Sequence, residues 1–217
     1  MGPHATLSST LGRMGVPMTR DRLDQATPDT WMYPPPAGWT YDQVKDLDLP
    51  FDWELVDGAI VVRGMTNVWH NRVRDRLYFA LESARRTPYA VASEQCVLVD
   101  DFNPPKPDVL VYDERDLDVF ALECIPVEKA TVVLEVVSPG SRREDRVRKP
   151  AMFADARVPY FWRVERGDDD FPVVHELWFH HDMGMYVPAP ERPVHTGKLV
   201  TERPFPVEID LRALVTG

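Results

Sequence analysis

One run of residues constrains the fold more than any other part of the chain. Residues 131–137 are almost continuous in β-branched and apolar side chains, which is typical of a central strand covered on both faces of a sheet. Glu135 interrupts this run, and a buried carboxylate is costly unless it is paired, protonated or bound to a metal. The sequence therefore predicts a buried strand that carries one chemically important acid. The alternative is an edge strand whose glutamate faces solvent.

A second acid stands at the start of another predicted strand. Asp108 follows Pro107 and precedes the run Val-Leu-Val-Tyr at residues 109–112, so a stiff loop would deliver its carboxylate to the strand end. Two carboxylates on neighbouring strands can hold Mg²⁺, which prefers oxygen ligands and keeps several waters. A nearby lysine could stabilise charge on a reacting phosphate or assist the attacking water. An acid after proline is also common as a plain turn residue.

Strands and helices alternate along the rest of the chain. Asp57-Gly58 lies between two β-prone runs and predicts a two-residue hairpin, because both turn residues must tolerate positive φ. Apolar spacing predicts a helix from about Asn67 to Arg86. Further expected elements are a short helix from Thr40 to about 47, strands at 89–99, 160–164 and 173–179, a strand pair near 185 and 199, and a terminal segment at 207–214. This order predicts an α/β (α+β) domain with a mixed central sheet, flanking helices and additional hairpins.

The segment after Glu135 predicts another helix. Its residues 141–144, Ser-Arg-Arg-Glu, have the pattern of a capping box. Asp145 and Lys149 are four residues apart and would share one helical face, although a solvated ion pair worth ~0.3–0.5 kcal/mol is the simpler interpretation. Pro150 removes a helical hydrogen bond at a cost of about 3 kcal/mol in a helix interior, so we expect the helix to be kinked or split there.

The net charge restricts how the chain could bind nucleic acid. There are 25 Lys and Arg residues against 35 Asp and Glu residues, a net charge of −10. Proteins that bind DNA non-specifically present a basic surface, so this charge argues against strong non-specific binding but not against a local basic patch. Arg142, Arg143 and Arg146 are candidate phosphate contacts. Alternatively, they form a solvated helix start that Glu144 and Asp145 offset.

Length and composition predict one domain with a flexible N-terminal extension. Residues 1–38 are rich in Gly, Pro, Ser and Thr without a sustained period, and residues 39–217 are expected to form the domain. No apolar run approaches the ~20 residues of a membrane span, and no signal-peptide core is apparent, so a cytoplasmic location is expected. Cys96 and Cys124 give no disulfide framework and no zinc spacing, and are expected to be small buried apolar residues.

Several motifs occur together in the order found in one known family. They are Trp53-Glu54-Leu55-Val56-Asp57-Gly58, His70, Lys106-Pro107-Asp108-Val109, Leu134-Glu135-Val136-Val137-Ser138-Pro139 followed by residues 141–145 and Lys149, and Val158-Pro159-Tyr160-Phe161-Trp162. This set spans roughly residues 40 to 215. It resembles the Uma2 family, also called DUF820, of the PD-(D/E)XK nuclease superfamily.

The resemblance implies a restriction-endonuclease-like core and a divalent cation, Mg²⁺ or Mn²⁺, held by Asp108 and Glu135. It also implies a displaced lysine. The usual position of that lysine in the superfamily, two residues after the glutamate, is Val137 here, and the family places it on the following helix at Lys149. The catalytic set is therefore expected to be Asp108, Glu135 and Lys149.

Three further residues are expected to support this set. The resemblance places Glu54 and His70 near the metal, and Asp145 shares a helical face with the lysine. For His70, a satisfied histidine on a helix face is an equal alternative.

The leading functional hypothesis is a metal-dependent DNA endonuclease, with a homodimer expected by analogy with similar cores. A catalytically inactive binding or scaffold protein with the nuclease fold is the first alternative. A nuclease fold repurposed for a small-molecule substrate is the second, because a fold does not fix a function.

Overall fold

The computed structural model describes residues 25–216 of the protein. The elements follow in the order α1 (Tyr41–Val44), β1 (Trp53–Val56), β2 (Ala59–Val62), α2 (Val68–Ala84), β3 (Tyr89–Ser93), β4 (Val97–Leu98), β5 (Val109–Asp113), β6 (Ile125–Pro126), the 3-10 turn η2 (Val127–Lys129), β7 (Ala130–Val136), the π-helical turn η3 (Glu144–Arg148), α3 (Lys149–Asp155), β8 (Tyr160–Arg166), β9 (Pro172–His180), β10 (Met185–Pro188), β11 (Val194–Thr196), β12 (Lys198–Thr201) and β13 (Val207–Asp210). The hairpin β1–β2, helix α2 and strands β5, β7, β8 and β9 lie where the sequence predicts them, to within about two residues.

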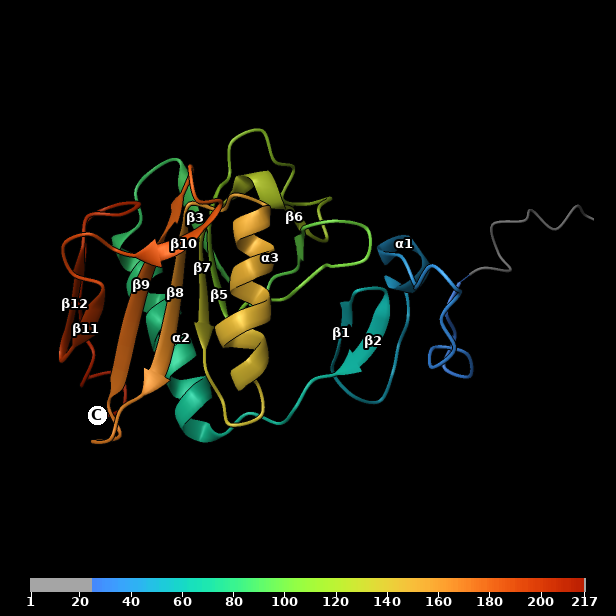
Figure 1. Ribbon diagram of the computed structural model, residues 1–217, viewed down its shortest axis with the longest axis horizontal. Coiled ribbons are helices and arrows are strands. Elements are labelled where there is room, and N and C mark those ends of the chain that lie inside the picture. Colours follow the sequence, from blue (N-terminus) through green and yellow to red (C-terminus); the bar gives the residue numbers. More distant parts are fainter. Residues whose placement is uncertain (1–24, 217) are drawn as a thin grey trace, which may run out of the picture.

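A mixed sheet of seven strands forms the centre of the described structure (Figure 1). The strand order is β10-β9-β8-β7-β5-β3, with β11 also paired to β9. Strands β7 and β8 are parallel, and the other neighbours are antiparallel. Strand β7 lies inside the sheet, and all its residues except Thr131 are buried. The predicted mixed α+β fold class is confirmed.

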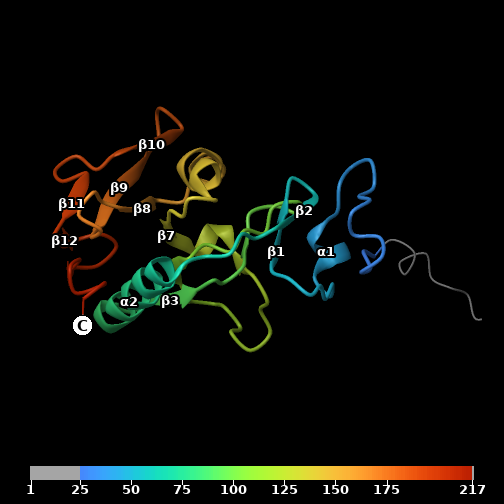
Figure 2. The same ribbon diagram turned by 90° about the horizontal axis from the view of Figure 1, so that it is seen from below.

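Helices cover the two faces of this sheet, with α2 on one face and α3 on the other (Figures 1 and 2). Leu77 of α2 packs in the same apolar cluster as Leu134 of β7. Phe153 of α3 packs with Val133 on the opposite face. Because side chains alternate along a strand, Glu135 points to the same face as Val133, which is the face covered by α3.

No helix in the described range of residues has the length and apolar content to cross a bilayer.

The helix after Glu135 is not split at Pro150, because residues 148 and 149 both keep helical dihedral angles; the helix changes from π to α type directly before the proline. In the turn η3 the N–H of Lys149 donates to the carbonyl of Glu144, and α3 then continues with Pro150 in its first turn. Proline has no N–H and so cannot continue the series of helical hydrogen bonds at this position. The π turn is wider than an α turn by one residue, and it accommodates the proline while Lys149 stays directed towards β7.

The predicted capping box at residues 141–144 does not form. The hydroxyl of Ser141 donates to the carboxylate of Asp145 and accepts from the N–H of Ser138. The Oε2 of Glu144 lies 3.5 Å from Nη1 of Arg148, so this carboxylate is directed along the helix and not back to its start. In a capping box the carboxylate of Glu144 would accept from the N–H of Ser141, but this N–H donates to the hydroxyl and the carbonyl of Ser138 instead. Ser141 therefore ties the turn after β7 to Asp145.

Two strand predictions are wrong, one in the extent of the strand and one in its pairing. The segment at 89–99 is not one strand, because Glu94 adopts a positive φ of 51° and ends β3. Strand β4 then leaves the central sheet and pairs in parallel with β6. The strands near residues 185 and 199 do not pair with each other: β10 pairs with β9, and β12 pairs with β13. Local patterns indicate that strands exist but not which partner each one finds.

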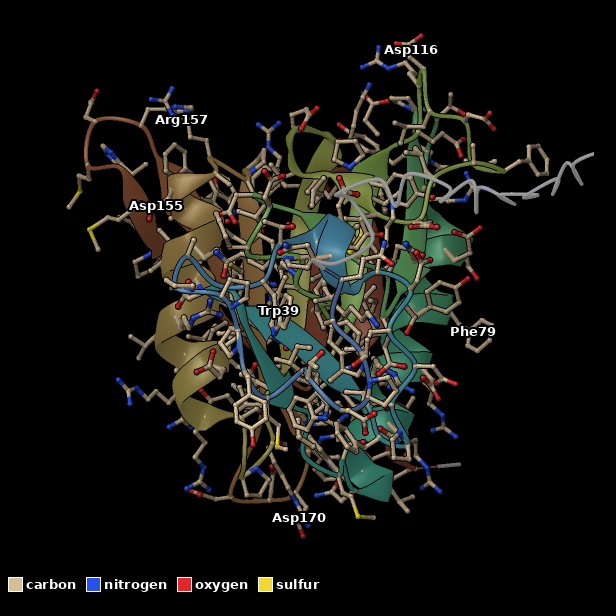
Figure 3. The ribbon with its side chains drawn as sticks, turned by 90° about the vertical axis from the view of Figure 1, so that its right-hand side faces the viewer. Trp39, Phe79, Asp116, Asp155, Arg157 and Asp170 are labelled. Atoms are coloured by element: carbon tan, nitrogen blue, oxygen red, sulfur yellow. A yellow bond between two sulfur atoms is a disulfide. The ribbon has the colours of Figure 1, made fainter. Side chains whose placement is uncertain are left out.

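The hairpin β1–β2 and the helix α1 form a small unit beside the central sheet, which we call the hairpin lobe (residues 25–62; Figures 1 and 2). Its apolar cluster consists of Trp39, Val44 and Leu55, and Trp39 lies near the middle of the side shown in Figure 3. The predicted turn is confirmed, with φ of 48° at Asp57 and 73° at Gly58. A Cβ at Gly58 would lie 2.7 Å from the Cα of Gly38, so glycine permits this close approach.

Most of the predicted flexible extension, residues 1–24, lies outside the described residues. Residues 25–38 contact the rest of the hairpin lobe. The N–H of Ala26 donates to the carbonyl of Gln43 at 3.0 Å, and the rings of Trp31 and Phe51 meet edge-on with centroids 5.5 Å apart. The domain boundary at residue 38 stays a prediction.

Cys96 and Cys124 form a disulfide, so the prediction of two independent buried cysteines is wrong. The parallel pairing of Val97 with Ile125, in β4 and β6, brings the neighbouring cysteines together. Two cysteines 28 residues apart carry no sequence signal of pairing unless that strand contact is known.

Loss of this disulfide is expected to destabilise the fold. The free energy of unfolding of the double variant Cys96→Ser/Cys124→Ser should be lower than that of the wild type by about 3 kcal/mol, because a cross-link over such a loop restricts the unfolded chain. Urea unfolding with and without reductant measures the effect. The two proteins should differ under oxidising conditions and have similar midpoints once the wild type is reduced. An equal midpoint under oxidising conditions would contradict the prediction.

Candidate active site

Side chains from separate parts of the chain meet in a cavity of about 200 Å³, which we call the acidic cavity. The hairpin, the start of α2, the strands β5 and β7, and the η3–α3 helix all contribute to its lining. The six predicted catalytic and supporting residues all line it: Glu54, His70, Asp108, Glu135, Asp145 and Lys149.

The sheet register explains why the two central acids meet. Strand β5 runs antiparallel to β7 with Val109 opposite Leu134, so the same register places Asp108 opposite Glu135. Their residues are only 3% and 2% exposed. Both carboxylates therefore enter one cavity from adjacent strands, and within residues 25–216 neither forms an ion pair with an arginine.

Asp108 is held by two donors. Its Oδ2 accepts from the N–H of Val136 at 2.7 Å and lies 3.3 Å from Nε2 of His70. Burial opposes ionisation of Asp108, but His70, Lys149 and the Val136 N–H outweigh it and lower the pKa of this carboxyl. Burial likewise opposes the charged form of His70, and Asp108 outweighs that effect and raises the pKa of the histidine. The helix α2 thus fixes the orientation of a strand carboxylate through His70.

Lys149, at the start of α3, binds the second acid, Glu135. Its Nζ lies 2.8 Å from Oε1 of Glu135 and 3.5 Å from Oδ1 of Asp145. Burial disfavours the ammonium, but Glu135, Glu54 and Asp145 raise the pKa of Lys149, so the lysine is held charged. Burial also raises the pKa of Glu135, with Asp145 and Asp108 adding to the effect and Lys149 opposing it. One ammonium therefore compensates the charge of several carboxyl groups in a poorly solvated space.

Arg63 also lines the acidic cavity, and the sequence interpretation did not include it. Its Nε lies 3.5 Å from Oε1 of Glu54, and its Nη1 lies 3.5 Å from Oε1 of Glu94. Arg74 of α2 binds the same Glu94 oxygen at 2.8 Å. The predicted hairpin could have indicated this position. Trp53 pairs with Val62, so Arg63 is a diagonal neighbour of Glu54 across the two strands.

The structure separates the three arginines predicted to contact phosphate. Arg142 and Arg146 line a second cavity of about 270 Å³, which shares His70 and Ser138 with the acidic cavity. Arg143 lines a different cavity, together with Val56 and Arg148 among others. Successive residues of a helical segment point in directions about 100° apart, so adjacent arginines need not face the same ligand.

The donor set in the acidic cavity fits a hard divalent cation. Five carboxylates line it, against one arginine and one lysine, so an added positive charge would be favourable. Residues 25–216 contain no group of three or more His, Cys, Asp and Glu side chains gathered around a common metal position. Magnesium, however, commonly binds through one or two carboxylates and keeps its remaining waters. Asp108 and Glu135 meet that requirement.

Comparisons with known proteins agree with this architecture. Residues 41–196 match the Uma2 family, described as "Putative restriction endonuclease". The crystal structure of "a putative nuclease belonging to DUF820" from Anabaena variabilis ATCC 29413 is similar, with a TM-score of 0.55 and 13% sequence identity over 82% of this chain and 97% of that chain. At this identity the likeness concerns the fold. No curated protein shows significant sequence similarity to the chain. With nearly three quarters of its length matched, the chain belongs to the Uma2 family.

Proposed function

We propose that the protein is a Mg²⁺- or Mn²⁺-dependent nuclease that hydrolyses phosphodiester bonds of DNA. The observation that carries the proposal is the convergence of Asp108, Glu135 and Lys149 on one cavity, from two adjacent strands and the helix that follows them. Membership of the Uma2 family supports a nuclease activity. Residues 39–217 would form the domain that carries it.

Asp108 and Glu135 would hold the cation. When bound, the cation supplies Lewis-acid activation of the phosphodiester and lowers the pKa of a coordinated water. His70 and the Val136 N–H keep the Asp108 carboxylate in a fixed orientation for this task. Their role is to position a group and not to react.

Lys149 would stabilise the charge that develops on the phosphate during attack. A preorganised cation in a poorly solvated site is worth far more than the same charge in water. Asp145 lies 3.5 Å from the lysine, and Ser141 donates to Asp145, so the ammonium is held before the substrate arrives. Arg63, beside Glu54 at the cavity wall, would offer a second positive charge to the phosphate.

Metal addition and removal test the proposal. The purified protein should nick or cut supercoiled plasmid DNA with added Mg²⁺ or Mn²⁺ and stop when EDTA is added. Glu135→Ala should abolish both the cleavage and the uptake of Mn²⁺ measured by calorimetry. Persistent cutting by the Glu135→Ala protein would eliminate the proposal. Failure of the wild type to take up either metal would favour a binding protein with an inactive nuclease fold.

A further inference from the structure

The second cavity beside the active site has the opposite charge, and we call it the basic cavity. Its lining contains three arginines, Arg142, Arg146 and Arg166, and one carboxylate, Glu165. The acidic cavity contains five carboxylates and two basic side chains apart from His70. The two cavities share His70 and Ser138 in their linings, so they lie next to each other.

Two of the three arginines are neutralised within the protein. Arg146 pairs with Glu165, and Arg166 binds Asp170 at 2.8 Å. The side chain of Arg142 has no ion pair and no hydrogen bond within residues 25–216. The five N–H donors of its planar guanidinium remain available for an anion such as a phosphate, which arginine binds in a bidentate manner.

The wall of the basic cavity is already fixed in place. The indole N–H of Trp69 donates to the carbonyl of Asp170 at 2.9 Å, and the guanidinium of Arg166 lies 5.8 Å from the Trp69 ring centroid. These contacts join the start of α2 to the turn between β8 and β9. A ligand in the cavity would therefore meet an ordered surface, which lowers the entropy lost on binding.

The turn that presents Arg142 is also coupled to the reaction centre. The N–H of Ser138 donates to the hydroxyl of Ser141 at 3.0 Å, and the N–H of Ser141 donates to the hydroxyl of Ser138 at 3.2 Å. Ser141 in turn donates to Asp145, beside Lys149. Arg142 follows directly after this braced turn, so its backbone is positioned relative to the lysine.

We infer that the basic cavity is a second subsite that binds a neighbouring phosphate of the DNA strand that is cut, with Arg142 as its binding group. This inference rests on the proposed function for the identity of the ligand. The segregation of charge explains how a chain with a net charge of −10 could hold a polyanion. The acidic cavity takes a cation, and the adjoining arginine takes the next phosphate.

DNA binding by matched arginine variants tests the subsite. Arg142→Ala and Arg143→Ala remove the same charge from adjacent positions, and neither arginine side chain has an ion pair or hydrogen bond within the described residues. Only Arg142 lines the basic cavity, whereas Arg143 lines another. The probe is a short fluorescein-labelled DNA duplex, measured by fluorescence anisotropy over a series of salt concentrations. Ca²⁺ replaces Mg²⁺ so that the acidic cavity still has a divalent cation, and a gel checks that the duplex stays uncut.

Arg142→Ala should raise the Kd by about tenfold and reduce the slope of log K against log salt by about 0.9, the value for one lost phosphate contact. Arg143→Ala should change both quantities much less. Equal effects of the two variants, or no duplex binding by the wild type, would overturn the subsite. Selective weakening by Arg142→Ala in a protein that never cleaves DNA would support the subsite while refuting the nuclease.

Discussion

Replacement of Lys149 by methionine is expected to lower the rate of DNA cleavage by about 10²–10³-fold, the usual cost of removing one preorganised group that stabilises transition-state charge. The binding of Mn²⁺ should persist, because Asp108 and Glu135 remain. Methionine keeps much of the length of the lysine side chain and removes the ammonium that lies 2.8 Å from Glu135. Plasmid cleavage at saturating metal measures the rate, and calorimetry measures the metal affinity.

Loss of stability must be separated from loss of chemistry in that variant. Removing one partner of a buried ion pair costs about 3–5 kcal/mol, because the other charge is left uncompensated. The double variant Lys149→Met/Glu135→Gln should recover part of that stability in urea unfolding and still fail to cleave. Lys129→Met changes a partly buried lysine that does not line the acidic cavity and serves as the matched control. Cleavage by Lys149→Met at the wild-type rate would remove the lysine from the mechanism.

Asp108→Asn is expected to show the second large effect, a loss of cleavage on the order of 10³-fold, since the Lewis-acid contribution of a bound cation is worth several kcal/mol. Asparagine keeps an oxygen that can accept from the Val136 N–H, so the local backbone should stay in place. The lost negative charge should weaken Mn²⁺ binding in calorimetry. Circular dichroism and thermal unfolding report whether the fold is retained.

Glu176→Gln is the matched control for this substitution. Glu176 is also only 2% exposed, and its carboxylate lies 3.1 Å from His195 and accepts from Thr201 at 2.9 Å. It does not line the acidic cavity. This variant should lower the thermal midpoint and keep the cleavage rate per folded molecule. If Asp108→Asn cleaved DNA as well as Glu176→Gln does, the assignment of Asp108 to the metal would be wrong.

The parts of the structure that follow from local physics were accessible from the sequence. The run around Glu135 forms a buried strand because its side chains have no other stable environment, and Asp57-Gly58 forms a hairpin turn because both residues adopt positive φ. Pro150 marks the point where the helix changes type. In each case neighbouring residues determine the outcome.

The features that depend on distant partners could not be predicted in this way. The disulfide requires β4 to pair with β6, and the position of Arg63 requires the hairpin lobe to lie against the start of β5. The carboxylates of Asp108 and Glu135 meet only through the β5–β7 register. That they face one cavity was a hypothesis from the sequence and the family resemblance, and the roles of these side chains still require the experiments above.

The two sides of the acidic cavity belong to parts of the protein that are packed separately. Glu54 and Arg63 reach the cavity from the hairpin side, whereas Asp108 and Glu135 belong to the central sheet. The lobe is held together by its own apolar cluster around Trp39 and not by the two clusters that cover the sheet. Local separation of such a unit requires less free energy than global unfolding. We therefore expect the hairpin side of the cavity to open at a lower free energy than the floor that holds the acids.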